Sequence, residues 1–179
     1  MRGRPSLGSA AAAVTVLEIA SFRCGHCAEF HRATFPALRE RYIDSGQVRW
    51  VVLNASDDPA DQHAKVYAVA RALHQRGRYW ANLDLLFQVG RRSSSYVDRA
   101  LAQIPDLDPP ALAAEAGGFA VRQAVAADFR QVAELKLPGT PIFIIAKTSA
   151  DGRRTEARVI GAETLANFRR TLEAVLQAP

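Results

Sequence analysis

The alternation of apolar and polar positions divides the chain into segments of two kinds. Residues 14–19 and 48–53 are almost wholly apolar, which is typical of strands covered on both faces of a sheet. Between them, residues 24–42 carry apolar side chains at helical spacing, and Pro36 is expected to kink this helix. A strand, a helix and a strand in so short a stretch predict a βαβ unit with a right-handed crossover.

The middle of the chain has a different pattern. Residues 58–135 show almost no strand signal and repeat apolar side chains at helical spacing. Asp58 and Pro59 favour a helix start, because an aspartate caps free N–H groups and proline is tolerated in the first turn. Glycines and prolines then divide the segment into successive helices. We therefore predict an all-helical lobe over residues 58–135.

Strand patterns return after Pro138. Residues 142–146 form an apolar strand, and Arg158–Ile160 belong to its partner. Between these strands, Asp151 and Gly152 predict a hairpin turn. An amphipathic helix with apolar residues on one face ends the chain.

The βαβ part and the ββα part each hold half of a sheet, so together they predict one mixed central sheet. The chain is then an α/β protein in which residues 14–57 and 136–179 form one domain and residues 58–135 form an inserted helical domain. Residues 1–13, which are rich in Arg, Gly, Ser and Ala, are expected to be a flexible leader outside the fold.

Charge and cysteine content exclude several classes of protein. The 179 residues include 23 Lys and Arg against 18 Asp and Glu, a net charge of +5. The basic residues are scattered rather than concentrated in one tract, so we expect no nucleic-acid partner. No apolar stretch is long enough to cross a bilayer. The two cysteines lie only three positions apart, which excludes a disulfide framework spread along the chain.

The two cysteines, Cys24 and Cys27, enclose Gly25 and His26 at the start of a predicted helix. The free N–H groups and the positive dipole end of a helix N-terminus stabilise a thiolate, so the pKa of Cys24 should be lowered. His26 adds to this effect if it is protonated or donates a hydrogen bond. Cys27 lies one turn further along, is expected to be more buried, and is close enough to close a small disulfide ring. The motif predicts a redox-active pair.

A Cys-x-x-Cys motif is also half of a common zinc site. Such a site needs a second pair of ligands, and the chain has no other cysteine. His31 falls on the same predicted helix, while His63 and His74 lie in the helical lobe; we expect all three on helix surfaces. We therefore expect no metal and no cofactor other than the cysteine disulfide itself.

The approach to the motif, residues 16–22, resembles the corresponding strand of the DsbA-like thioredoxin family. The segment 139–141, followed by an apolar strand, resembles that family's cis-proline loop, and the inserted helical lobe matches as well. The resemblance runs from Val14 onward and implies a thioredoxin fold and protein disulfide oxidoreductase activity. The dipeptide Gly25-His26 resembles protein disulfide isomerase instead of DsbA, which leaves the redox direction open.

The resemblance implies roles for three further residues. Pro141 would be a cis-proline facing the cysteine pair, and Thr140 would offer its backbone to an extended substrate peptide. Glu18, a charge within an apolar strand, would lie beneath the pair and exchange a proton with Cys27. The alternatives are an ordinary trans-proline at a strand start and a glutamate at a strand end that reaches solvent.

Four functions remain compatible with the sequence. The first is oxidation of thiol-containing proteins or peptides, which implies a reoxidising partner such as a quinone-linked membrane protein and a periplasmic or cell-envelope location. The second is disulfide isomerisation or reduction, favoured by Gly25-His26. The third is a non-catalytic or metal-holding module. The fourth is a glutathione-dependent relative, although these often lack the cysteine that Cys27 supplies. We expect a monomer, because no separate dimerisation domain is evident.

Overall fold

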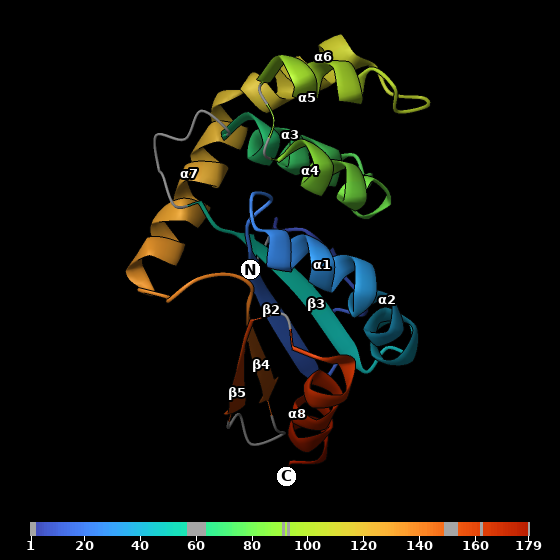
Figure 1. The fold of residues 1–179 in the computed structure, drawn as a ribbon, viewed down its shortest axis with the longest axis vertical. Coiled ribbons are helices and arrows are strands. Elements are labelled where there is room, and N and C mark those ends of the chain that lie inside the picture. Colours follow the sequence, from blue (N-terminus) through green and yellow to red (C-terminus); the bar gives the residue numbers. More distant parts are fainter. Residues whose placement is uncertain are drawn as a thin grey trace.

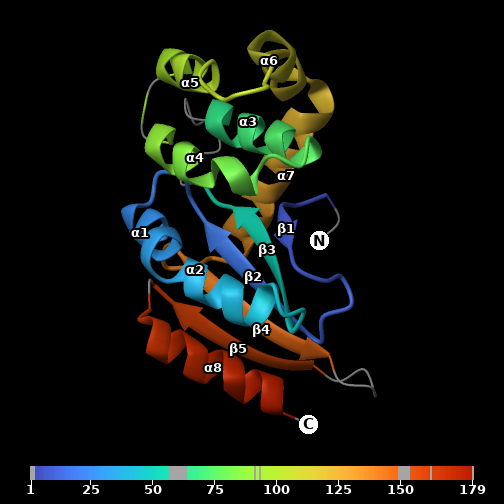
Figure 2. The ribbon, with the colours of Figure 1, turned by 90° about the vertical axis from the view of Figure 1, so that its right-hand side faces the viewer.

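The computed structural model describes residues 3–56, 64–90, 92, 94–148, 154–161 and 163–178. In this part of the chain one mixed sheet has the strand order β1-β3-β2-β4-β5 (Figures 1 and 2). Its strands are β1 (Ser6–Leu7), β2 (Val14–Ala20), β3 (Val48–Asn54), β4 (Ile142–Thr148) and β5 (Arg154–Ile160). Strand β2 pairs parallel with β3 and antiparallel with β4. The two ends of the chain therefore complete one sheet, and the predicted α/β class is confirmed.

Helices cover both faces of the sheet. Helices α1 (Gly25–Ala33), α2 (Phe35–Leu38) and α8 (Leu165–Gln177) lie on one face, and α7 (Phe119–Glu134) runs along the other (Figures 1 and 2). Strand β2 is central, so Val16 packs into the core beneath α1 while Ile19 belongs to a second core cluster. This double burial explains why its sequence reads as almost continuously apolar.

The predicted single helix over residues 24–42 is wrong in detail. Helix α1 ends at Ala33, α2 begins at Phe35, and a π-helical turn, η1 (Arg39–Ile43), follows. Proline has no N–H to continue the hydrogen-bond ladder, and its ring crowds the preceding turn. Pro36 therefore lies in the first turn of a new helix, where its missing N–H costs nothing, and the helix is interrupted at Thr34.

The described residues of the inserted segment form helices joined by turns, with no strand among them. The segment contains α3 (Ala64–Gln75), the 3₁₀ turn η2 (Trp80–Asn82), α4 (Leu83–Val89), α5 (Ser94–Leu101), α6 (Pro109–Gly117) and the whole of α7. Asp108 caps α6 by accepting a hydrogen bond from the N–H of Ala111 at 3.1 Å. The predicted helix start at 58–59 and the hairpin turn at 151–152 lie outside the described residues.

The prediction that residues 1–13 lie outside the fold is wrong. Strand β1 pairs antiparallel with β3, and the N–H of Val52 donates to the carbonyl of Pro5 at 2.9 Å. The Arg4 side chain reaches α7 and donates to Asp128 at 3.0 Å. The signal was missed because a two-residue edge strand has no periodicity to detect.

An aromatic cluster holds α1 against the sheet. Phe30 of α1 lies with its ring centroid 4.5 Å from that of Phe143 on β4, and Phe143 contacts Phe168 of α8 at 4.9 Å. Trp50 of β3 stacks on Phe168 at 5.8 Å. All four side chains are fully buried. Because such cores are densely packed, the start of α1, where the cysteines lie, has a fixed position over the end of β2.

A candidate redox site at the start of helix α1

Cys24 occupies the N-cap position of α1. Its Sγ accepts a hydrogen bond from the backbone N–H of Cys27 at 3.3 Å, as a capping side chain does. Cys24 is partly exposed, whereas Cys27 is fully buried one turn into the helix. Both thiols are free in this structure. The site therefore offers one accessible sulfur with a second sulfur protected behind it.

The surroundings of the two sulfurs shift their pKa values in opposite directions. Burial raises the pKa of Cys24, but hydrogen bonds from the side chains of Thr140 and Cys27 and from the N–H groups of Cys27 and His26 outweigh it, so the pKa lies below its ordinary value. Burial raises the pKa of Cys27, and the charges of Cys24 and Glu18 raise it further. The thiolate therefore forms on the accessible sulfur.

The loop before β4 lies directly against Cys24. The Cys24 thiol donates a hydrogen bond to the carbonyl oxygen of Thr140 at 3.2 Å, and the Thr140–Pro141 peptide bond is cis. Pro141 is buried, and Thr140 is partly exposed. The sequence predicted Cys24, Thr140 and Pro141 as site residues. They lie together at the end of the sheet, although Cys24 is far from the other two in the chain.

Glu18 is fully buried on β2, on the face that α1 covers. Its Oε2 accepts a hydrogen bond from the indole N–H of Trp50 at 2.8 Å, and its Oε1 lies 2.8 Å from Nε2 of His31. The alternative of a glutamate that reaches solvent is therefore wrong. Burial does most to raise the pKa of Cys27, and the charge of Glu18 raises it further.

The prediction that His31 lies on a helix surface is wrong, because its side chain is buried against Glu18. Two signals in the sequence point to this position. His31 follows Cys27 by four residues, which places both on one side of a helix, and a buried Glu18 requires a partner. His26, by contrast, is exposed and contributes its backbone N–H to the Cys24 thiolate. His74 is half-buried, and His63 lies outside the described residues.

The helical lobe packs on the segment that leads into Cys24, a contact the sequence did not reveal. Tyr67 of α3 shares a 2.8 Å hydrogen bond with Ser21, whose hydroxyl also accepts from the N–H of Arg23 at 3.2 Å. The Phe22 ring lies 5.3 Å from those of Tyr67 and Phe87. Trp80 and Phe87 of the lobe both pack against the main core. The lobe therefore fixes the approach to the reactive sulfur.

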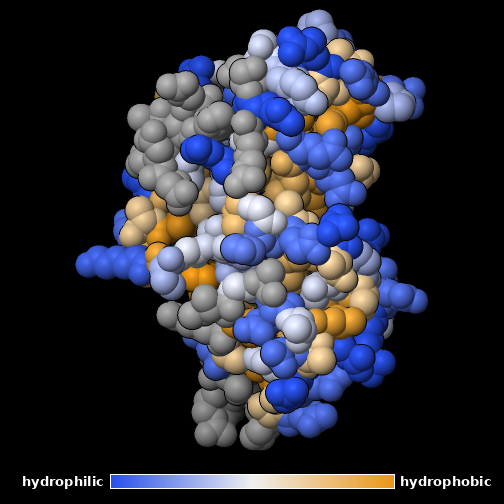
Figure 3. All heavy atoms as spheres, in the orientation of Figure 1, coloured by the Kyte–Doolittle hydropathy of each residue, from blue (hydrophilic) through white to orange (hydrophobic). Residues whose placement is uncertain are grey.

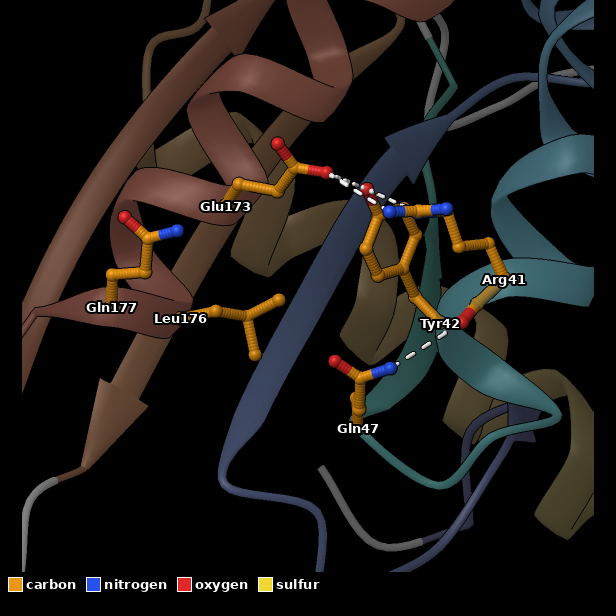
Figure 4. A pocket seen from close by; sticks show the side chains of 6 residues that line it. All are labelled: Arg41, Tyr42, Gln47, Glu173, Leu176 and Gln177. Atoms are coloured by element: carbon orange, nitrogen blue, oxygen red, sulfur yellow. Dashed lines mark hydrogen bonds and ion pairs between the residues drawn. The ribbon is translucent and has the colours of Figure 1, made fainter.

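A polar cavity of about 600 Å³ lies elsewhere, between the end of η1 and α8. Figure 4 shows Glu173 reaching across its mouth toward Arg41 and Tyr42, and the Tyr42 hydroxyl donates to Glu173 at 2.5 Å. No cysteine lines it. Hydrophilic and apolar side chains alternate over the face in Figure 3, without a continuous apolar band. The cysteine pair, with its shifted pKa values, is therefore the better candidate for chemistry.

Among the described residues, no group of three or more His, Cys, Asp or Glu side chains could hold a metal ion. No helix in the same part of the chain has the length and apolar character needed to span a membrane.

Comparisons with known proteins agree with this geometry. A family model described as thioredoxin matches residues 2–162, so the chain belongs to this thioredoxin family. The crystal structure of Wolbachia pipientis alpha-DsbA1 has a TM-score of 0.82 with 21% identity and covers 98% of this chain and 92% of that one. BdbD from Bacillus subtilis gives a TM-score of 0.77 with 17% identity, covering 99% and 95%. The predicted thioredoxin fold with a helical insertion is confirmed.

Relatives found by sequence match shorter stretches. A putative protein-disulfide oxidoreductase of Rickettsia typhi is 37% identical over 62 residues, which is 35% of this chain and 23% of that protein. A probable disulfide bond formation protein D of Bacillus anthracis is 23% identical over 145 residues, 76% of this chain and 66% of that protein. The chain thus aligns with about a quarter to two thirds of the length of these relatives.

Proposed function

We propose that this protein catalyses thiol–disulfide exchange and that it oxidises thiols of protein or peptide substrates. The observation that carries the proposal is the asymmetry of the pair: Cys24 is accessible with a lowered pKa, and Cys27 is buried with a raised one. Only the thiolate attacks or leaves efficiently, so this arrangement directs substrates to one sulfur.

The exchange takes place in two steps. A substrate thiolate attacks Sγ of Cys24 in the disulfide form; the Cys24–Cys27 bond breaks, and the electron pair leaves on Cys27, which takes up a proton. A second substrate thiolate then attacks the substrate sulfur of this mixed disulfide. A substrate disulfide forms, and Cys24 leaves as the thiolate that its hydrogen bonds stabilise. Two electrons pass from the substrate to the pair.

The oxidising direction follows from the pKa of Cys24. Hydrogen bonds that favour the thiolate stabilise the reduced protein relative to its disulfide, and a stabilised reduced form makes a stronger oxidant. The isomerase or reductase alternative rests on the dipeptide Gly25-His26. At Gly25 an added Cβ would meet nothing within 4 Å, so packing does not explain the absence of a larger residue there.

The substrate contacts belong to the same proposal. A peptide that reaches Cys24 passes the loop at Thr140 and Pro141, where extended backbone can pair with backbone. Continued turnover needs an oxidant that restores the disulfide, for which we propose a quinone-linked membrane partner. An oxidant of thiols functions in an oxidising compartment, so we propose the periplasm or cell envelope as its location. We propose that the protein works as a monomer.

Single-turnover oxidation of a reduced dithiol peptide tests this function. The oxidised wild-type protein should convert the peptide to its disulfide, and Cys24→Ser should abolish the reaction. Cys27→Ser, mixed with the disulfide form of the peptide, should accumulate a mixed disulfide: the Cys24 thiolate attacks the peptide disulfide, one peptide sulfur leaves as a thiolate, and no Cys27 is present to resolve the adduct, which mass spectrometry identifies. Full activity of Cys24→Ser, or a substrate adduct on Cys27, would overturn the proposal.

A further inference from the structure

A single serine, Ser21, organises the turn that joins β2 to the cysteine motif. Its hydroxyl accepts a hydrogen bond from the N–H of Arg23 at 3.2 Å, and its carbonyl oxygen accepts one from the N–H of Cys24 at 3.0 Å. Serine side chains commonly bond the backbone two residues further on, which closes a tight turn. Because Cys24 is the N-cap residue of α1, both bonds constrain the backbone at and just before the helix start.

The buried sulfur contacts the same serine. Burial raises the pKa of Cys27, and a hydrogen bond from the backbone of Ser21 partly offsets this by lowering it. A bond that lowers the pKa of a thiol favours the thiolate, which can only accept, so the donor is the N–H of Ser21. One residue thus bonds both halves of the cysteine pair, with its carbonyl oxygen on Cys24 and its N–H on Cys27.

The helical lobe reaches this serine through one hydroxyl group. The Tyr67 hydroxyl on α3 shares a 2.8 Å hydrogen bond with the hydroxyl of Ser21, and both residues are buried. The Tyr67 ring packs 5.3 Å from the ring of Phe22 and 5.0 Å from that of Phe129, so packing fixes where its hydroxyl lies. Hydrogen bonds are directional, unlike apolar contacts, and a buried hydroxyl is costly to leave unpaired. Tyr67 therefore constrains the position of Ser21 more closely than ring packing alone would.

We propose that Tyr67 is a positioning residue for the exchange reaction, because its hydroxyl, bound to Ser21, holds the turn that places Cys24 at the N-cap of α1. The inference rests on the proposed function. The N–H groups of His26 and Cys27 stabilise the Cys24 thiolate only while its sulfur stays at the N-cap. Without the Tyr67 hydroxyl the turn loosens, Cys24 moves away from these donors, and the reduced protein loses stability relative to its disulfide. The lobe thereby sets how strongly the pair oxidises.

The discriminating variant is Tyr67→Phe, which removes one oxygen atom and keeps the ring that packs on Phe22. The measurement is the equilibrium constant, at neutral pH, for the reaction in which the Cys24–Cys27 disulfide is reduced while two glutathione thiols become one glutathione disulfide. Tyr42→Phe is the matched control. The Tyr42 hydroxyl is also hydrogen-bonded, to Glu173, but it lies at the polar cavity beside α8, which no cysteine lines.

In Tyr67→Phe this equilibrium constant should fall by roughly twofold to tenfold, the range that one net hydrogen bond supports. Tyr42→Phe should lower the free energy of unfolding and leave the equilibrium constant unchanged. A wild-type value in Tyr67→Phe would overturn the inference, and so would an equal fall in Tyr42→Phe, because the effect would then reflect a general loss of stability. Failure of the wild-type protein to exchange with glutathione would overturn the proposed function itself.

A double-mutant cycle tests whether Tyr67 acts through Ser21. Ser21→Ala should lower the equilibrium constant at least as much as Tyr67→Phe, because it removes the bonds to both Tyr67 and Arg23. Adding Tyr67→Phe to Ser21→Ala should cause no further fall, since the shared bond is already absent. Additive falls would overturn the route through Ser21. If Tyr67→Phe does not fold, Ser21→Ala alone carries the test, and a wild-type equilibrium constant in that variant would overturn the inference.

Discussion

Gly90, at the end of α4, packs directly against the backbone of Phe22, two residues before the reactive Cys24. A Cβ at position 90 would lie 2.3 Å from the carbonyl oxygen of Phe22, far inside van der Waals contact. The helical lobe and the approach to the active sulfur therefore touch backbone to backbone. Through this contact the inserted lobe holds the segment that leads into Cys24.

We predict that Gly90→Ala destabilises the protein and disturbs Cys24, because the methyl group must displace the Phe22 carbonyl. The cost should be about 1–3 kcal/mol, the range for overpacking, and the alkylation rate of Cys24 should change. Gly117→Ala, at a helical position where a Cβ meets nothing within 4 Å, should be neutral or slightly stabilising. Chemical denaturation and iodoacetamide kinetics measure both effects, and equal behaviour of the two variants would refute the contact.

The buried acceptor on Glu18 leads to a second prediction. Trp50→Phe should lower the free energy of unfolding by about 1–3 kcal/mol, because Oε2 of Glu18 loses its donor inside the core. Trp80→Phe removes an equivalent indole bond, to the carbonyl of Ser6 at 3.0 Å, but at a partly buried position. Its cost should be smaller. Urea denaturation of both variants gives the comparison, and a larger loss in Trp80→Phe would contradict it.

The opposite pKa shifts predict a maximum in the stability of the reduced protein. The pKa of Cys24 is lower in the folded protein than in the unfolded chain. The free energy of unfolding therefore rises as pH increases from the folded pKa to the unfolded pKa, and this stability is lost as pH falls through the folded pKa. The pKa of Cys27 is higher in the folded protein than in the unfolded chain. Its contribution to stability is full at pH values below the unfolded pKa and is lost as pH rises towards the folded pKa. The maximum should therefore lie near the ordinary thiol pKa of about 8.5.

Denaturation of the reduced protein minus that of the oxidised protein isolates this effect, because the disulfide form carries neither thiol. The single-cysteine variants form no internal disulfide, so their stability is compared with that of the oxidised wild type: Cys24→Ser should lack the rising limb, and Cys27→Ser should lack the falling limb. A difference that does not vary with pH would mean that neither sulfur is perturbed.

The sequence predicted the parts of the site that local rules govern. A cysteine pair between a strand and a helix defines an N-cap sulfur, and a glutamate within an apolar strand indicates a buried charge. It did not predict the partner of that charge. His31 is buried by tertiary packing of Phe35 and Phe87 around its ring, which helical periodicity alone does not reveal.

Two parts of the fold escaped prediction for similar reasons. Strand β1 is held by pairing with β3 and by the reach of Arg4 to Asp128, contacts between residues far apart in the chain. The interruption at Thr34 reflects the preference of Pro36 for the first turn of a helix. In both cases the local pattern was weak, and long-range or positional effects decided the outcome.

The reduction potential of the Cys24–Cys27 pair against glutathione tests the central claim most directly, because it measures how far the helix start stabilises the thiolate. The account predicts a reversible disulfide with a potential clearly above the roughly −270 mV of thioredoxin, as a pair with a stabilised reduced form requires. A potential at or below that value, or a pair that forms no disulfide under oxidising glutathione, would contradict it.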